Sequence, residues 1–508
     1  MITFKQNNEI TYDDKELMEE NSFIGAKIDT TPLPVYNEVK ASLPQPIWEN
    51  HKDYIDCYWK AWEIAFRNLR QPKENTGFVT NYIDAAFNGC IFMWDSAFML
   101  MFGKYADRIF NFQKTFDNFY SHQHVDGFIC RQIEEETGND IFARHDPAST
   151  GPEVMTWCEW EYYLNFGDKQ RLARVFPCLV AYHQWMQEHF TWRDGTYFSS
   201  GYGCGMDNCP RLDGKYHVCY SHGHMVWVDA CMQELNACNL LIKMANELGR
   251  EEFIPELQAE SDHLFKVINE KLWDNETKFY YDLKNDDTFN GVKHIGAFWA
   301  LLAKCLPESR AEDFIAHLNN ENEFKTDHRV PTLSKDHPEY NPKGGYWCGS
   351  VWAPTNYMVL KGLDSYKKFD LSYEIARNHL DFAVEVFKDT DTLFENYSPE
   401  YHDGKALRGS SSLPDFVGWT GLIPISVMFE YVFGIKPDAS NNKITWYINL
   451  TDKHGIEKYP FGTEGELTLI CEKRNSEEEK PQIKIESNIH VTVEIIWNKV
   501  KNTETINL

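Results

Sequence analysis

Two acidic residues stand in segments whose composition suits chemistry. Asp207 lies in GYGCGMDNCPR, residues 201–211, where several glycines allow the backbone to turn tightly. Glu395 lies in DTLFENYSPE, residues 391–400, among apolar and aromatic neighbours. A carboxyl group is costly to bury in such surroundings, so its presence indicates either function or a structural ion pair. Either residue alone could also be a turn former or a helix-end residue.

The two carboxyl groups become informative as a pair. Hydrolysis of a glycosidic bond needs one protonated acid for the leaving oxygen and one ionised base that activates water. Such a pair needs two different environments, one that raises the pKa of the acid and one that keeps the base ionised. An inverting mechanism would hold the two carboxyl groups about 6.5 to 9.5 Å apart.

The helical pattern explains how two distant loops could meet. Apolar periodicity predicts about twelve helices, for example from Lys52 to Leu69 and from Met225 to the stop at Gly249. Short links, at 166–168, 249–251, 306–308 and 362–365, alternate with long connections. The long connections are 71–94, 121–151, 191–221, 274–292, 320–348 and 389–418. This alternation predicts a mainly α fold, an (α/α)6 barrel of six helical hairpins with its long loops on one rim.

Three regions follow from the changes in pattern. Residues 1–50 carry four prolines and no sustained period, which predicts an irregular arm. Residues 51–435 would form the barrel. Residues 436–508 would form a small β domain, because ITWYINL, GELTLIC, QIKIE and VTVEIIW alternate or are rich in β-branched residues.

Aromatic, acidic and amide side chains in the long loops suit a sugar pocket. Flat aromatic rings can cover a sugar ring, while charged and amide groups hydrogen-bond its hydroxyls. The candidates for substrate binding are Trp94, Asp95, Arg131, Gln132, Arg211, Trp347, Trp352, Asp415 and Trp419.

Composition excludes several other classes of partner. The net charge of −27 repels nucleic-acid phosphates and anionic membranes. No apolar run reaches the length of a membrane span, and the first residues lack a secretory signal pattern. Thirteen scattered cysteines are typical of reduced, buried thiols. We therefore expect a cytoplasmic protein with a small carbohydrate substrate, without nucleic-acid or membrane partners and of undetermined oligomeric state.

Two other chemistries compete with hydrolysis. A zinc site could use residues from the crowded set Cys204, Cys209, His217, Cys219, His222 and His224, but their spacing matches no usual ligand signature. A sugar epimerase or isomerase on the same toroid could use His222 and His224 as acid and base. An inert carbohydrate-binding protein would bind without turnover.

Five blocks in order resemble glycoside hydrolase family 63: FMWDSAF, GMDNCPR, GGYWCGSVWAPTNY, LFENYSPE and DFVGWTGLIPISVMFEYVFGI. The similarity is to its compact bacterial members, related to mannosylglycerate and glucosylglycerate hydrolases, and more distantly to trehalases of family 37. It covers roughly residues 50–435. The resemblance implies inverting hydrolysis of an α-glycoside without a metal or other cofactor, with Asp207 as general acid and Glu395 as general base. From these roles we expect a raised pKa for Asp207 and an ionised Glu395 near neutral pH. It also implies that Trp94 and Asp95 belong to the sugar pocket.

Two departures bear on substrate identity. Cys348 stands where an Arg is common in the family, and Cys209 replaces a common Ser beside the acid. The large N-terminal β domain of eukaryotic processing glucosidases is absent, which argues against glycoprotein trimming. The sequence thus predicts an exo-acting α-glucosidase for a small α-glucoside or disaccharide, with a mannosylglycerate- or glucosylglycerate-type hydrolase as the alternative.

Overall fold

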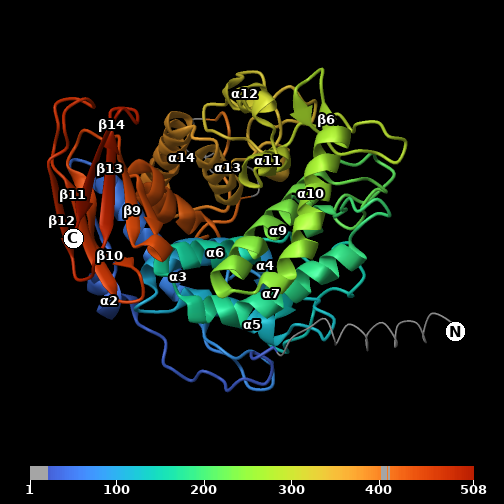
Figure 1. The fold of residues 1–508 in the computed structure, drawn as a ribbon, viewed down its shortest axis with the longest axis horizontal. Coiled ribbons are helices and arrows are strands. Elements are labelled where there is room, and N and C mark those ends of the chain that lie inside the picture. Colours follow the sequence, from blue (N-terminus) through green and yellow to red (C-terminus); the bar gives the residue numbers. More distant parts are fainter. Residues whose placement is uncertain (1–20, 402–408, 410–411) are drawn as a thin grey trace.

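The computed structural model describes residues 21–401, residue 409 and residues 412–508. The protein is mainly helical, and its C-terminal strands gather in sheets at one side of the helical body (Figure 1). Residues 1–20 of the predicted N-terminal arm, and residues 402–408 and 410–411 of the sixth long connection, lie outside the described residues. No helix in the described part of the chain is both long and apolar enough to cross a membrane.

The helices follow each other around a closed path. The helix α4 packs on α6, α6 on α9, α9 on α11, and α11 on α13, while the turn η8 contacts both α13 and α4. Helices α7, α10 and α14 pack outside α9 and α13. The bounds of the helices are α2 (Tyr36–Val39), α3 (Lys52–Arg67), α4 (Met93–Gly103), α5 (Thr115–Ser121), α6 (Met155–Phe166), α7 (Lys169–His189), α8 (Gly201–Cys204), α9 (Val228–Leu248), α10 (Ile254–Lys271), α11 (Trp299–Leu302), α12 (Glu308–Ala316), α13 (Ala353–Ser365) and α14 (Phe369–Thr390), with the 3₁₀ turn η8 (Thr420–Leu422) and the π-helical η9 (Ile423–Val432).

Local chemistry sets several helix ends where the sequence predicts them. Gly167 ends α6 in the left-handed region at φ 65°. The Asp168 side chain caps α7 by accepting hydrogen bonds from the backbone N–H groups of Gln170 and Arg171. Gly249 ends α9 in the same way at φ 69°. The link predicted at 362–365 is wrong, because α13 continues to Ser365. Gly362 serves packing instead, since a Cβ there would lie 2.5 Å from Leu301 Cβ.

Two four-stranded sheets form the β part. Their orders are β1-β10-β11-β12 and β14-β13-β9-β8, and β13 runs parallel to β9. The strand β1 comes from the segment predicted to be irregular and pairs Gln45 with Glu457. The predicted strands correspond to β9, β11, β12 and β13, whereas β1, β8, β10 and β14 were missed. The bounds are β1 (Gln45–Trp48), β8 (Ile435–Asp438), β9 (Lys443–Ile448), β10 (His454–Phe461), β11 (Gly465–Cys471), β12 (Ile483–Ser487), β13 (Thr492–Trp497) and β14 (Asn502–Asn507).

Short hairpins brace the long connections. The strand β4 (Cys90–Phe92) pairs with β5 (Gln132–Glu134), so that Phe92 faces Gln132 directly before α4 begins. The other two-stranded pairs are β2 (Leu69–Arg70) with β3 (Tyr82–Ile83) and β6 (Trp273–Asp274) with β7 (Phe279–Tyr280). The β4–β5 pair joins the first long connection to the second and thereby positions two cavity residues.

Candidate active site

A cavity of about 600 Å³ collects residues from five of the six long connections. Such a volume suits a small ligand rather than a polymer. Aromatic rings and a few charged groups make up its wall. The lining residues are Phe87, Asn88, Phe92, Trp94, Asp95, Arg131, Gln132, Ile141, Phe142, Gly151, Pro152, Tyr202, Gly205, Asp207, Tyr220, Tyr346, Trp347, Glu395, Leu413 and Trp419.

The Asp207 segment is held tightly by its glycines. A Cβ on Gly201 would lie 2.6 Å from the Asp207 backbone oxygen, and one on Gly203 would lie 2.8 Å from Pro147 O. Gly205 adopts φ 74° directly before the turn and faces the Trp94 ring. The sequence therefore needs glycine at these positions for the loop to carry Asp207 into the cavity wall.

Burial raises the pKa of Asp207 to about 6, and the nearby positive charge of Arg131 opposes that rise. The Arg131 guanidinium lies over the Phe142 and Tyr202 rings, at 4.5 and 4.9 Å from their centroids. Its Nε donates to Ala148 O at 2.9 Å. Stacking and this hydrogen bond thus fix the position of Arg131. Its positive charge acts on Asp207. The raised pKa agrees with the expectation for a general acid.

Glu395 is buried and hydrogen-bonded at both carboxylate oxygens. The Tyr346 hydroxyl donates to Oε1 at 3.2 Å, and the Leu413 backbone N–H donates to Oε2 at 3.4 Å. The Trp419 indole N–H fixes the backbone by donating to Glu395 O at 2.8 Å. These contacts orient the side chain toward the cavity that Asp207 also lines.

Glu395 is expected to be ionised near neutral pH, whereas a pKa of about 7 leaves it only partly ionised there. Burial raises its pKa to about 7, the two hydrogen bonds lower it, and the negative charge of Asp207 raises it further. Sequence reasoning missed this because the segment's apolar neighbours indicate burial but not its extent. Both carboxyl groups therefore titrate near neutrality.

Asp95 adds a third carboxyl group. It lies in the first turn of α4, is 5% exposed, and follows Trp94, which lines the cavity. Burial, followed by the negative charge of Glu395, raises its pKa well above the usual range. A carboxyl group held in its neutral form can donate a hydrogen bond to a ligand oxygen.

Six of the nine predicted binding residues line the cavity, namely Trp94, Asp95, Arg131, Gln132, Trp347 and Trp419. The other three do not line it. Arg211 is buried away from it, where it donates to Asp229 and Asp282 and covers the Trp227 ring at 4.0 Å. Trp352 stacks behind Trp347 with ring centroids 4.0 Å apart, and so supports a cavity residue. Asp415 is exposed and pairs with Thr392 and Arg67.

The residues of the two rival chemistries also lie elsewhere. His222 and His224 pack around Trp192, and neither lines the cavity. Cys204 and Cys209 are buried, and the Cys219 thiol donates to the Asp207 backbone oxygen at 3.5 Å. Within the described residues, the ligand atoms close enough for one metal ion belong to three other side chains.

Several lining residues were missed by sequence reasoning. Tyr346 is the most informative, because it donates directly to Glu395. Its position next to Trp347 in GGYWCGSVW was a usable signal, since a Tyr hydroxyl in an aromatic loop needs a partner when buried. Phe142, Tyr202 and Tyr220 carried no such signal, because their part of the wall depends on how two long connections pack together.

Residues 91–412 match the mannosylglycerate hydrolase MGH1-like glycoside hydrolase domain. The chain belongs to this glycoside hydrolase family, as its sequence blocks predicted, and it is a glycoside hydrolase of family 63. The comparisons therefore place it among hydrolases rather than among sugar epimerases.

Individual relatives support the same family. The chain is 26% identical over 474 residues to an uncharacterised protein of Borreliella burgdorferi, covering 90% of this chain and 95% of that one. It is 24% identical over 385 residues to the mannosylglycerate hydrolase of Thermus thermophilus, covering 63% of this chain and 91% of the relative.

Solved structures share the fold. The crystal structure of a Thermus thermophilus mannosylglycerate hydrolase in complex with glucose superposes with a TM-score of 0.58 at 20% identity, covering 72% of this chain and 99% of that one. The neutral trehalase of Saccharomyces cerevisiae superposes with a TM-score of 0.53 at 13% identity, covering 68% and 73%. The predicted distant similarity to trehalases is confirmed at the level of fold.

Proposed function

We propose that the protein is an inverting hydrolase of a small α-linked glycoside, of the mannosylglycerate- or glucosylglycerate-type. The observation that carries the proposal is that Asp207 and Glu395, from different long connections, line one cavity of about 600 Å³. The closed path of helices supports an (α/α)6 barrel over residues 51–435, with residues 436–508 as a β unit. The strand β1 at Gln45–Trp48 joins that unit.

In the proposed mechanism, Asp207 in its protonated form donates to the bridging oxygen of the substrate. Glu395 in its ionised form removes a proton from water, which attacks the anomeric carbon from the opposite face. Trp94, Trp347 and Trp419 offer apolar faces to the sugar ring. The neutral Asp95 carboxyl group can donate a hydrogen bond to a sugar hydroxyl. Arg131 offers a positive charge to the hydroxyls. The productive protonation state has Asp207 neutral and Glu395 charged. Because the pKa of Asp207 is about 6 and that of Glu395 about 7, this is the minor form of the singly protonated pair.

A neutral α-glucoside or disaccharide is the second candidate substrate, and the charge of the cavity favours it. Of the described lining residues, Asp95, Asp207 and Glu395 are acidic and Arg131 is basic. Cys348 stands where an Arg is common in the family, and its side chain contacts Asn208 O at 3.3 Å. An anionic aglycone would therefore depend on Arg131 for charge recognition.

A substrate panel tests both candidates. Purified protein would be incubated with mannosylglycerate, glucosylglycerate, trehalose and other α-linked disaccharides, and NMR would follow the anomer released first. The proposal expects cleavage with the β-anomer appearing first. Initial release of the α-anomer would contradict inversion, interconversion of monosaccharides would favour an isomerase, and binding without turnover would favour an inert binder. The ratio of kcat/KM between glycerate and neutral substrates separates the two candidates.

A further inference from the structure

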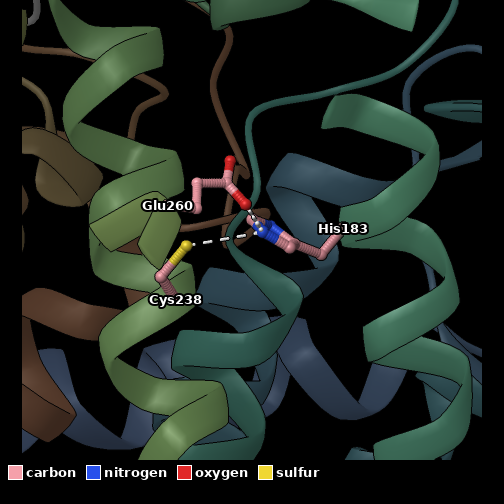
Figure 2. Close-up of side chains that lie close together, drawn as sticks. All are labelled: His183, Cys238 and Glu260. Carbon is pink, nitrogen blue, oxygen red and sulfur yellow. Dashed lines mark hydrogen bonds and ion pairs between the residues drawn. The ribbon is translucent and has the colours of Figure 1, made fainter. Parts of the chain in front are cut away.

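Three side chains from three helices converge in the interior, away from the cavity. His183 lies on α7, Cys238 on α9 and Glu260 on α10 (Figure 2). His183 Nε2 lies 2.9 Å from Glu260 Oε2 and 3.4 Å from Cys238 Sγ. None of the three residues lines the candidate active site. Their ligand atoms all lie within 4.8 Å of one another.

These separations are those of atoms that share one metal ion. Zinc binds imidazole nitrogen and carboxylate oxygen at about 2.0 to 2.2 Å and thiolate sulfur at about 2.3 Å, so ligands in a tetrahedral shell are roughly 3 to 4 Å apart. The nitrogen–oxygen and nitrogen–sulfur distances here are already close to that range. An ion could therefore be bound by small side-chain adjustments, without moving a helix.

The other ring nitrogen of His183 is held as metal sites usually require. Glu234 Oε2 lies 2.9 Å from Nδ1 and is suited to accept a hydrogen bond from it. A carboxylate on Nδ1 fixes the tautomer that leaves the Nε2 lone pair free, and it increases the basicity of that nitrogen. The geometry thus resembles the carboxylate–histidine–metal arrangement.

The surroundings carry an excess of buried negative charge. Glu234 and Glu153 are each 1% exposed, and Glu234 and Glu260 both contact the His183 ring. A divalent cation would stabilise such a group of carboxylates more than one imidazolium does.

We propose that His183 Nε2, Cys238 Sγ and the Glu260 carboxylate bind a divalent metal ion of the zinc class. A water molecule would complete the shell. In the metal-free protein His183 is an imidazolium; binding replaces its Nε2 proton and the thiol proton of Cys238, both of which pass to solvent, so affinity rises with pH. The ion would enter past Gln187, which is exposed and donates to Glu260 at 2.9 Å. It would join α7, α9 and α10 and stabilise the fold.

The alternative is a metal-free cluster in which a protonated His183 bridges Glu234 and Glu260. Zinc binding to the full chain separates the two. After chelator treatment and dialysis, the protein would be titrated with Zn²⁺ by calorimetry, and the retained metal counted by mass spectrometry. We expect one ion per chain and a higher unfolding temperature with Zn²⁺. With Co²⁺ as a substitute we expect a thiolate-to-metal charge-transfer band.

Matched variants assign the site. Cys238→Ala should weaken binding at least about 100-fold and abolish the cobalt band, whereas Cys231→Ala, a buried cysteine on the same helix, should leave both unchanged. Glu260→Gln, which preserves shape, should weaken binding by about 10- to 100-fold. The proposal is overturned if the wild-type chain retains no zinc, or if Cys238→Ala binds as tightly as Cys231→Ala. Loss of binding in Cys219→Ala instead would move the ion to the Asp207 loop and equally overturn it.

Discussion

The side-chain oxygen of Asn208 accepts a hydrogen bond from the backbone N–H of Trp347 at 2.8 Å, and its amide donates to Gly345 O at 3.1 Å. Asn208 directly follows Asp207, and Tyr346, which lies between Gly345 and Trp347, donates to Glu395. One continuous set of contacts therefore joins the two carboxyl groups across the cavity. Their relative position depends on Asn208 as well as on the helices.

Replacing Asn208 with Ala should disturb this connection more than the fold. We expect kcat to fall about 10- to 100-fold, because a small displacement of a catalytic group is costly. The free energy of unfolding should fall by about 1 to 2 kcal/mol for the lost hydrogen bonds. Steady-state kinetics and urea unfolding measure the two effects. Unchanged kcat in Asn208→Ala would show that the loop holds its position without this residue.

Amide variants test the proposed acid and base. Asp207→Asn and Glu395→Gln should each lower kcat by about 10²- to 10⁴-fold, because neither amide can transfer the required proton. Binding of an unreacted substrate, measured by calorimetry, should change little. Asp213→Asn, an exposed carboxyl in the same connection, is the matched control and should keep normal turnover. Near-normal rates in both amide variants would refute the assignment.

Tyr346→Phe should shift the pH dependence of activity. The hydroxyl stabilises the ionised form of Glu395, so its loss should raise the pKa of Glu395 further above about 7. Because the pKa of Glu395 lies above that of Asp207, it sets the basic limb of the kcat/KM profile, which should move to higher pH by about half a unit to one unit while the maximum falls. Tyr216→Phe, outside the cavity wall, serves as control. If this limb of the pH profile does not move while kcat falls, the role of Tyr346 is purely steric.

Arg211→Met tests a buried ion-pair network rather than substrate binding. It would leave the buried carboxylates of Asp229 and Asp282 without their guanidinium partner, and removing one member of such a group costs about 3 to 5 kcal/mol. By contrast, Arg67→Ala breaks a half-exposed pair with Asp415 and should cost at most about 1 kcal/mol. Chemical denaturation of both variants makes the comparison. Equal stabilities would contradict the structural role of Arg211.

The raised pKa of Glu395 predicts a pH-dependent cost to stability. Below the unfolded-state pKa of about 4.3 both states bind the proton, so the group costs nothing. As the pH rises toward the folded-state value of about 7, the unfolded state ionises first and stability is lost. Glu395→Gln should therefore unfold a few degrees higher than the wild type at pH 8 and at nearly the same temperature at pH 4. A lower unfolding temperature at pH 8 would contradict this assignment.

The sequence predicted those features that local patterns encode. Gly249 and the apolar stripe before it define α9, and the ordered blocks around Asp207 and Glu395 identify the family. Short β segments were harder to predict. Residues 454–461 contain Pro460 and a bulge at Lys458 with φ 59°, which interrupt the alternation that predicts a strand. Asp452 and Gly455 also have the residue types of a turn, although β10 already begins at His454.

The limits of the site prediction have a similar cause. Arg211 and Trp352 have the residue types of a sugar pocket, but side-chain direction depends on long-range packing that spacing does not encode. Arg211 turns to Asp229 and Asp282, whose distance in sequence hides the pairing. The raised pKa of Glu395 likewise depends on the closure of the cavity around it.

The pairing of β1 with β10 has a consequence for biosynthesis. Gln45 is translated before the helical region, whereas its partner Glu457 is translated only after it. The backbone groups that β1 pairs with β10 therefore have no partner until residues 454–461 have been translated. Completion of the molecule is thus a late, nearly post-translational event, and premature termination would leave an exposed sheet edge prone to association with other chains.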